Sequence, residues 1–315
     1  MDNADNFLTQ PSVTAVVCTR NRGERIVKTI ESLLANRHPN YEVLVIDQST
    51  NSETEAAVNH LFSDHRLRYI RSATRGTGLS RGLGLTNARG SVVAYTDDDC
   101  TVPEDWLEKM EAVFALDAKI AVAFCNVVPA PHDETAGFVP AYIRQEDMIV
   151  RTVWDKCRAR GIGAGMAVRR QPVLSYGSFD PLLGPGTEFS DCEDGDIAVR
   201  ALLNGWWVFE TAQTHVIHDG FRTWQEGKEL NKRNWTGIGA AYAKPIRCGR
   251  WQAGVIVAYE ALVVALLKPF SRIFLLKKPQ GVRSFYYFCR GFWHGFQQSV
   301  DCEYMVYRNS EVAGK

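Results

Sequence analysis

Short apolar runs that end in polar residues constrain the fold of this chain more than any other feature. Val13–Cys18, Tyr41–Ile46, Leu67–Ile70 and Ser91–Thr96 have the length and the β-branched content of buried strands. Segments with apolar residues at helical spacing lie between them, for example near Leu79–Ala88. Strands that alternate with helices predict an α/β fold with a parallel sheet and right-handed crossovers.

Polar side chains follow three of these strands. Asp47 comes directly after the second strand, and Asp97–Asp99 come after Ser91–Thr96. The loop after the first strand consists of Thr19, Arg20, Asn21 and Arg22. In parallel sheets ligands bind beyond the carboxyl ends of the strands, so the sequence predicts a binding site at this edge.

Three consecutive aspartates, Asp97, Asp98 and Asp99, predict a cation site. Like charges this close raise each other's pKa, and a bound cation relieves that repulsion. Mg²⁺ or Mn²⁺ would suit such oxygen ligands and would leave positions open for phosphate oxygens. The alternative is a solvated turn that caps the helix expected to open at Pro103 and Glu104.

A second acidic cluster, Asp191–Asp196, opens a helix that runs to Leu203 and is stopped by Asn204-Gly205. A carboxylate at a helix N-terminus is stabilised in its charged form, which suits a general base such as Asp194. The alternative is a helix that is merely capped by acids.

Two further residues have a functional and a structural interpretation. Arg81 opens the helix before the aspartate strand, where a planar guanidinium would suit a diphosphate, but it could equally be a solvated surface charge. His218 lies in a loop, where a lone histidine is more often part of a hydrogen-bonded scaffold than a metal ligand.

Charge and hydropathy bear on partners. The chain has 36 basic and 36 acidic residues among 315, so nothing in its net charge favours nucleic acid. Residues 261–300 contain no Asp or Glu, yet they carry Lys268, Arg272, Lys277, Lys278, Arg283 and Arg290. This C-terminal region also has an apolar helical segment and many aromatic residues. It either packs on the rest of the chain or lies in a membrane interface, with basic residues on anionic lipid.

No signal for export or for a membrane span is evident. Residues 1–10 are polar and slightly acidic, and no uninterrupted apolar run reaches about 18 residues. The nearest approach, Ala253–Leu267, is short and contains Glu260. The eight cysteines are scattered without a C-x-x-C pair, which favours reduced thiols and a cytoplasmic protein, with peripheral attachment at the inner face of the membrane as an option.

Five motifs in order resemble bacterial family 2 glycosyltransferases over about residues 12–220. They are V-V-C-T-R-N-R (16–22), V-L-V-I-D-Q-S-T (43–50), G-L-S-R (78–81), A-Y-T-D-D-D (94–99) and E-D-G-D-I-A-V-R (193–200). The resemblance implies a Rossmann-like GT-A fold with a mixed, mostly parallel sheet flanked by helices and followed by a helical C-terminal region. The expected organisation is a tail over 1–11, a catalytic domain over 12–224 and a helical region over 225–315.

The resemblance also implies roles for individual residues. The 19–22 loop and Asp47 would hold the nucleotide, Arg81 would face the diphosphate, and Asp97 and Asp98 would lie in the donor site, with Asp98 by the ribose. A divalent metal, Mg²⁺ or Mn²⁺, would be held by Asp99 and His218. Asp194 would be the base of an inverting transfer from a nucleotide diphosphate sugar to a saccharide or a lipid-linked acceptor.

Two departures from the family pattern leave specificity open. Asp47-Gln48-Ser49 stands where many members have D-D-G-S, and Gly165 stands where many have an asparagine before M-A-F-R-R. The competing interpretations are a nucleotidyltransferase, whose Gly-rich loop after the first strand is missing here, and a catalytically degenerate nucleotide-sugar-binding or scaffold protein. The intact aspartate cluster and Asp194 argue against the degenerate protein.

Overall fold

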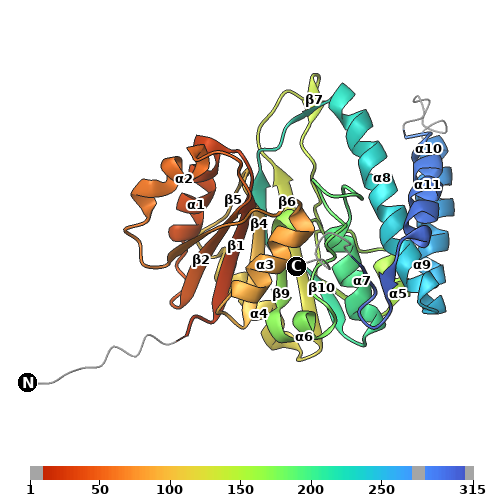
Figure 1. The fold of residues 1–315 in the computed structure, drawn as a ribbon, viewed down its shortest axis with the longest axis horizontal. Helices are drawn as coiled ribbons and strands as arrows, with labels where there is room; N and C mark the ends of the chain where they lie inside the picture. The colour runs from red at the N-terminus through yellow and green to blue at the C-terminus, as the bar shows by residue number, and fades with distance from the viewer. Residues whose placement is uncertain (1–9, 272–280, 309–315) are drawn as a thin grey trace, which may run out of the picture.

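A curled central sheet organises the protein (Figure 1). The computed structural model describes residues 10–271 and 281–308. Within them nine strands form this sheet, in the order β3-β2-β1-β4-β9-β6-β10-β5, with β8 also paired to β10. Their bounds are β1 Val13–Thr19, β2 Tyr41–Asp47, β3 Leu67–Arg71, β4 Val92–Asp97, β5 Cys100–Thr101, β6 Ile120–Pro129, β8 Met148–Val150, β9 Met166–Arg169 and β10 Trp207–His218.

The sheet is mixed and mostly parallel, as the sequence predicts. Strands β1, β2, β3 and β4 are parallel, and β6 is parallel to β10. Strand β9 runs antiparallel between β4 and β6, so those two groups point the same way, and only β5, β8 and β9 among the described strands oppose them. The four strands expected in the first half are confirmed. Strand β9 has only four residues, too few to show a period in the sequence.

Helices cover both faces of this sheet. Buried side chains of α1 (Val27–Leu34) and α4 (Trp106–Leu116) pack on one face. Those of α3 (Thr77–Asn87), α6 (Arg170–Ser175) and α7 (Glu193–Leu203) pack on the other. Helix α7 ends where predicted, before Gly205 at φ +82°. Helix α4 begins at Trp106, after a turn in which the Trp106 amide donates to the Pro103 carbonyl, and so starts later than expected.

Shorter elements connect this framework. The short helices are η1 Gly23–Ile26, α2 Glu53–Val58, η2 Asn59–Leu61, α5 Val153–Lys156 and η3 Gly163–Gly165. Two small sheets pair β7 (Gly137–Phe138) with β11 (Arg222–Thr223), and β12 (Val300–Asp301) with β13 (Val306–Tyr307).

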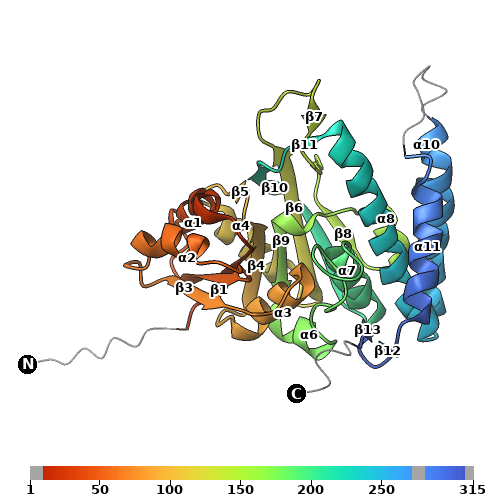
Figure 2. The same ribbon diagram turned by 45° about the horizontal axis from the view of Figure 1, so that its top comes forward.

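A layer of helices follows the sheet and lies outside α7 (Figure 2). Its members are α8 Trp224–Arg247, η4 Trp251–Ala253, α9 Gly254–Ala258, the π-helix η5 Tyr259–Leu267, α10 Lys268–Ser271 and α11 Ser284–Gln297. Helix α11 packs closely on α8, since a Cβ on Gly291 would lie 2.1 Å from the Thr236 carbonyl oxygen. The predicted C-terminal helical region is therefore present. Residues 1–9 of the expected tail, and Arg272, Lys277 and Lys278, lie outside the described residues.

The expectation about apolar runs is refined in this layer, and the expectation about its thiols is wrong. Trp251–Phe270 forms one continuous helical stretch of 20 residues with mean hydropathy 1.8, which is long and apolar enough to cross a membrane by length and composition. Reading uninterrupted apolar runs missed it, because Glu260 interrupts the run without ending the helix. Cys248 and Cys302 form a disulfide, so the prediction of reduced thiols is wrong for this pair. The other six cysteines, all in described segments, are free.

Candidate active site

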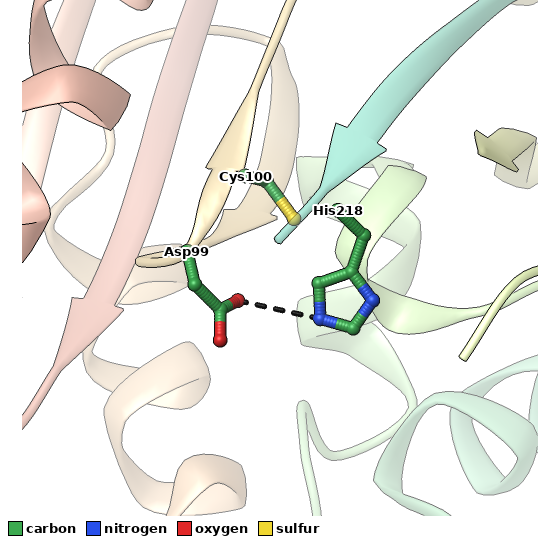
Figure 3. A group of neighbouring side chains, drawn as sticks. All are labelled: Asp99, Cys100 and His218. Atoms are coloured by element: carbon green, nitrogen blue, oxygen red, sulfur yellow. Dashed lines mark ion pairs between the residues drawn. The ribbon is translucent and has the colours of Figure 1, made fainter. Parts of the chain in front are cut away.

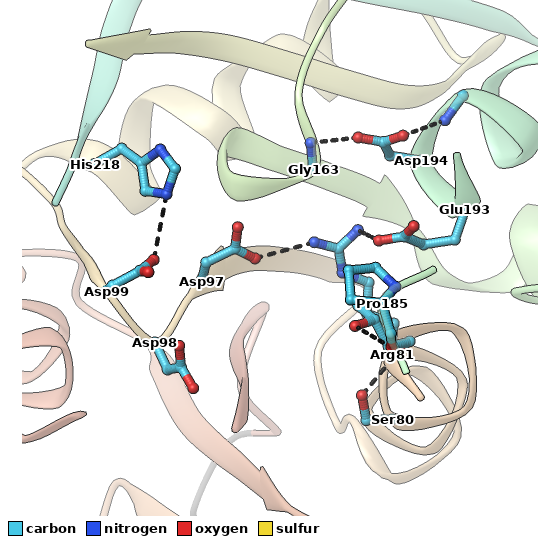
Figure 4. Close-up of polar contacts among 12 residues, drawn as sticks. Ser80, Arg81, Asp97, Asp98, Asp99, Gly163, Pro185, Glu193, Asp194 and His218 are labelled. Atoms are coloured by element: carbon cyan, nitrogen blue, oxygen red, sulfur yellow. Dashed lines mark hydrogen bonds and ion pairs between the residues drawn. The ribbon is translucent and has the colours of Figure 1, made fainter. Parts of the chain in front are cut away.

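The polar residues singled out in the sequence meet at the carboxyl edge of the sheet. Asp97 ends β4 and Asp98 and Asp99 follow it, and β10 brings His218 beside them because His218 pairs in register with Cys100 of β5. The N-terminus of α7 lies across the same space, with Arg81 between the two sides (Figure 4). The prediction that the 19–22 loop, Asp47 and Asp97–Asp99 share one edge is confirmed, because Thr19 pairs with Asp47 and Cys18 with Asp97 at the ends of neighbouring parallel strands.

Arg22 neutralises two of the aspartates. Its Nε donates to Asp98 Oδ1 at 2.8 Å and its Nη2 donates to Asp99 Oδ2 at 3.1 Å. Burial raises the pKa of Asp98 to about 6, against the lowering effect of Arg22. Burial also acts to raise the pKa of Asp99, but hydrogen bonding to His218 and the charges of His218 and Arg22 bring it below its usual range. The carboxylates are therefore held in place by exchangeable cationic side chains.

His218 has the orientation expected of a metal ligand. Its Nδ1 lies 3.0 Å from the Pro140 carbonyl oxygen and its Nε2 lies 3.4 Å from Asp99 Oδ1 (Figure 3). When Nδ1 donates its proton to the Pro140 carbonyl, the lone pair of Nε2 faces the Asp99 carboxylate. Nε2 and the carboxylate oxygen are then both acceptors, so a proton or a cation must lie between them. Burial lowers the pKa of His218, but Asp99 and the Pro140 carbonyl together raise it above its ordinary value.

These residues fit a divalent ion. One ligand atom from each of Asp99, Cys100 and His218 lies within 4.8 Å of the others. The Cys100 side chain is buried in the core, and burial raises its pKa strongly, so it stays a neutral thiol and a poor ligand. A carboxylate and an imidazole would leave the remaining positions to water and phosphate oxygens, as Mg²⁺ and Mn²⁺ prefer.

Asp194 is held by backbone amides. Its Oδ2 accepts a hydrogen bond from the Gly163 amide at 2.7 Å, and its Oδ1 accepts one from its own neighbour, the Gly195 amide, at 2.6 Å. The carboxylate stands in the first turn of α7, where the helix dipole also favours negative charge. A partly buried carboxylate oriented in this way is suited to accept a proton.

Arg81 occupies an internal position between two carboxylates. It is only 4% exposed, its Nη1 donates to Glu193 Oε1 at 2.9 Å, and its Nη2 donates to Asp97 Oδ1 at 3.1 Å. Burial raises the pKa of Glu193, and the charge of Arg81 opposes that rise. Both ends of the guanidinium are engaged within the protein, so its contact with a diphosphate stays a prediction.

The nucleotide-binding residues expected nearby occupy different environments. Thr19 is buried at the end of β1, whereas Arg20 is exposed. Asn21 adopts φ +55° and accepts from the Thr50 amide at 2.9 Å, which ties the loop to the end of β2. Asp47 is fully buried and accepts from the Ser49 amide at 2.8 Å and from the Tyr69 hydroxyl at 2.5 Å. Its described contacts orient the loop after β2, and its contact with a nucleotide stays a prediction.

Sequence reasoning missed two residues of this site. Gly163 donates to Asp194 and also packs against Arg81, since a Cβ there would lie 2.4 Å from Arg81 Nη1. Glu193 was seen only as part of an acidic cluster, although it anchors Arg81. The glycine-rich run at 161–165 was a signal for Gly163, but sequence spacing did not show what approaches it.

Comparisons with known proteins point to a family for part of this chain. Residues 14–135 match the model of Glycosyl transferase family 2. The chain is 40% identical over 120 residues to the succinoglycan biosynthesis protein ExoO of Rhizobium meliloti, covering 38% of this chain and 34% of that protein. It is 28% identical over 226 residues to the glucosyl-dolichyl phosphate glucuronosyltransferase of Haloferax volcanii, covering 66% of this chain and 69% of that protein. The match thus spans about a third of ExoO.

Solved structures confirm the GT-A fold. The mannosyltransferase PcManGT of Pyrobaculum calidifontis, solved with GDP-Man and Mn²⁺, superposes with a TM-score of 0.63. The alignment covers 91% of this chain and 88% of that one at 19% sequence identity. At this identity the likeness shows the fold, while the residues that act must be argued from this chain.

Proposed function

We propose that this chain, which belongs to Glycosyl transferase family 2, moves a sugar from a nucleotide diphosphate donor to an acceptor hydroxyl with inversion at the anomeric carbon. The observation that carries the proposal is the pairing of two sites at one edge of the sheet. Asp194 is an oriented carboxylate, and Asp99 with His218 forms a ligand pair suited to a divalent ion.

The proposed reaction is a single displacement. Asp194 takes the proton of the acceptor hydroxyl, and the oxygen attacks the anomeric carbon from the face opposite the diphosphate. The bond from that carbon to the diphosphate oxygen breaks, and its electron pair leaves with the nucleotide. General base assistance of this kind is worth about 10² to 10⁴ in rate. No covalent intermediate on the protein is required.

Asp99 and His218 would hold Mg²⁺ or Mn²⁺. When bound, the ion would neutralise negative charge on the departing diphosphate. Around it, Arg22 would be free to move from Asp98 and Asp99 toward the donor, and the 19–22 loop with Asp98 would contact the nucleoside. The acceptor would be a saccharide or a lipid-linked glycan.

Nucleotide release by the purified chain tests this proposal. The assay compares UDP-, GDP- and dTDP-sugars with Mn²⁺, Mg²⁺ or a chelator, and cell lipid extract supplies acceptors. We expect metal-dependent release that falls by about 10² to 10⁴ in Asp194→Asn, while Mn²⁺ binding measured by electron paramagnetic resonance is retained. Asp99→Asn should lose both Mn²⁺ binding and release.

A carboxylate outside the site provides the matched control. Asp105 stands before α4 and pairs with Lys109, so Asp105→Asn should retain release and metal binding. Unchanged release in Asp194→Asn would refute its role as base. Absence of metal-dependent donor binding in the intact chain would refute the transferase assignment for this site.

A further inference from the structure

The helical stretch Trp251–Phe270 is apolar yet largely uncovered. Only 28% of its most apolar 18-residue window is buried, whereas a core helix of similar hydropathy would be mostly buried. Its protein-facing side consists of residues such as Ala253, Ile256 and Ala265. Its outward side exposes Trp251 (73%), Val255, Leu262, Val263, Leu267 (59%) and Phe270.

Helix α11 exposes apolar and aromatic side chains beside it. The buried residues Ser284, Phe288, Gly291 and Gly295 form the side that packs on α8. The opposite side and the residues just before the helix expose Val282, Tyr286 (60%), Trp293 (64%) and Phe296. Both views place α9, α10 and α11 at the edge of the molecule beyond α8 (Figures 1 and 2). We call the exposed residues of the two helices the C-terminal apolar face.

Residues 261–300, which supply most of this face, carry charges of one sign. Residues 261–300 contain no carboxylate, although the whole chain has 36. Arg250, Lys268, Arg283 and Arg290 are exposed at the ends and sides of the two helices. Exposed apolar side chains bordered by cations fit the interface of an anionic bilayer, where aromatic rings lie at headgroup depth and basic groups meet lipid phosphates.

Internal contacts indicate that the helix lies on the bilayer and does not cross it. Glu260, in the middle of the stretch, is 4% exposed and forms an ion pair with Arg160 at 2.7 Å. A spanning helix would have to break this pair and expose Glu260 to hydrocarbon. Insertion of the outward side alone leaves the pair intact.

We propose that the C-terminal apolar face binds an anionic lipid surface, with both helices lying in the interface. This binding does not depend on the chemistry at Asp194. The protein would then attach peripherally, through apolar insertion together with electrostatic attraction.

Vesicle flotation of the full chain tests the proposal without donor or acceptor. We expect flotation with phosphatidylcholine–phosphatidylglycerol vesicles and much less with phosphatidylcholine alone. Leu267→Glu with Trp293→Glu should lower binding more than tenfold. Arg283→Glu with Arg290→Glu should lower binding to the anionic vesicles by at least tenfold, at roughly fivefold for each arginine charge lost.

Substitutions elsewhere on the surface are the matched controls. Leu116 is 63% exposed at the end of α4, and Lys119 is exposed before β6, so Leu116→Glu and Lys119→Glu should bind vesicles like the intact chain. Failure of the intact chain to float, or equal binding by the Leu267→Glu/Trp293→Glu variant, would overturn the proposal. A dimer that this variant dissociates, without vesicle binding, would assign the face to a second copy. Nucleotide release in detergent-free buffer reports the proposed chemistry separately.

Discussion

Asp194 and Asp99 are carboxylates at the same edge of the sheet, but the protein holds them by different means. Asp194 accepts hydrogen bonds from two backbone amides, those of Gly163 and Gly195. Asp99 is paired with two side-chain groups, the guanidinium of Arg22 and the imidazole of His218. Asp194 is fixed by backbone dipoles, whereas Asp99 is balanced by the Arg22 guanidinium and the His218 imidazole, and in the proposed reaction a metal ion would replace the Arg22 charge and the His218 proton.

This difference matches the two tasks proposed for them. Backbone donors orient a carboxylate base and keep it ionised, although they also favour its charged form over its protonated form. Side-chain cations keep a carboxylate ionised in a partly buried place and can be exchanged for a metal ion. The contrast therefore predicts that backbone changes near Asp194 impair the chemical step, whereas side-chain changes near Asp99 alter metal affinity.

Gly163→Ala tests how backbone amides hold Asp194. Of the substitutions Gly163→Ala, His218→Asn and Arg22→Gln, it should have the largest effect. The new Cβ would lie 2.4 Å from Arg81 Nη1, and Arg81 is held on its other side by Glu193 and Asp97. Either the guanidinium or the Gly163 amide must shift, which misplaces Asp194. We expect kcat for nucleotide release to fall by about 10- to 100-fold with Mn²⁺ affinity nearly unchanged, because a small displacement of a catalytic group is costly.

Gly254→Ala is the matched control. Nothing lies within 4 Å of a Cβ at Gly254 and its backbone φ is not positive, so this change should leave both activity and melting temperature near those of the intact chain. If Gly163→Ala retained full kcat while folded, the orientation of Asp194 by this loop would not matter for turnover.

The strands and the site edge were readable from sequence because each buried strand has its own apolar run and ends in a polar residue. Only the resemblance to family 2 glycosyltransferases put His218 with Asp99, and the structure places His218 at the end of β10, where the sequence predicted a loop. Sequence reasoning could not find the Gly163–Asp194 hydrogen bond or the Arg81–Glu193 ion pair, since both join residues far apart in the chain. The Cys248–Cys302 disulfide, with a sequence separation of 54, was missed for the same reason.

The pH dependence of metal binding tests the proposal that a metal ion replaces the proton between His218 and Asp99. His218 must lose its Nε2 proton to bind a metal, and Asp99 holds that proton by raising the pKa of His218 above its ordinary value. We therefore expect Mn²⁺ affinity to fall about tenfold for each pH unit below the raised pKa. The stability of the metal-free protein depends on pH in the opposite direction. The His218–Asp99 pair stabilises the fold below about pH 6.5, and this contribution is lost as the pH rises through the pKa of His218 in the folded protein.

His218→Asn should weaken Mn²⁺ binding and flatten its pH profile, as measured by electron paramagnetic resonance titration. His215, three residues earlier on β10, provides the control, because His215→Asn should keep both the affinity and the slope. A profile that stayed steep in His218→Asn would mean that another group carries the competing proton.

Arg22→Gln should produce the smallest and the most diagnostic change. Arg22 places its positive charge on Asp98 and Asp99 in the metal-free protein, so it competes with an incoming cation. Removing that charge should tighten Mn²⁺ binding to the nucleotide-free protein by roughly three- to tenfold, as expected for one screened, partly exposed charge near the site. Arg22→Lys keeps the charge and should leave affinity within about twofold of the intact chain.

The same substitution should lower nucleotide release, because the displaced guanidinium is proposed to serve the donor. Tighter metal with slower release is a combination that simple damage to the site would not give, since misfolding weakens both. Arg20→Gln, an exposed change in the same loop, should leave Mn²⁺ affinity unaltered. If Arg22→Gln left Mn²⁺ affinity unchanged or weakened it, Arg22 would be a structural partner of the aspartates and would not compete with the metal. The proposal that a metal ion displaces Arg22 from Asp99 would then be wrong.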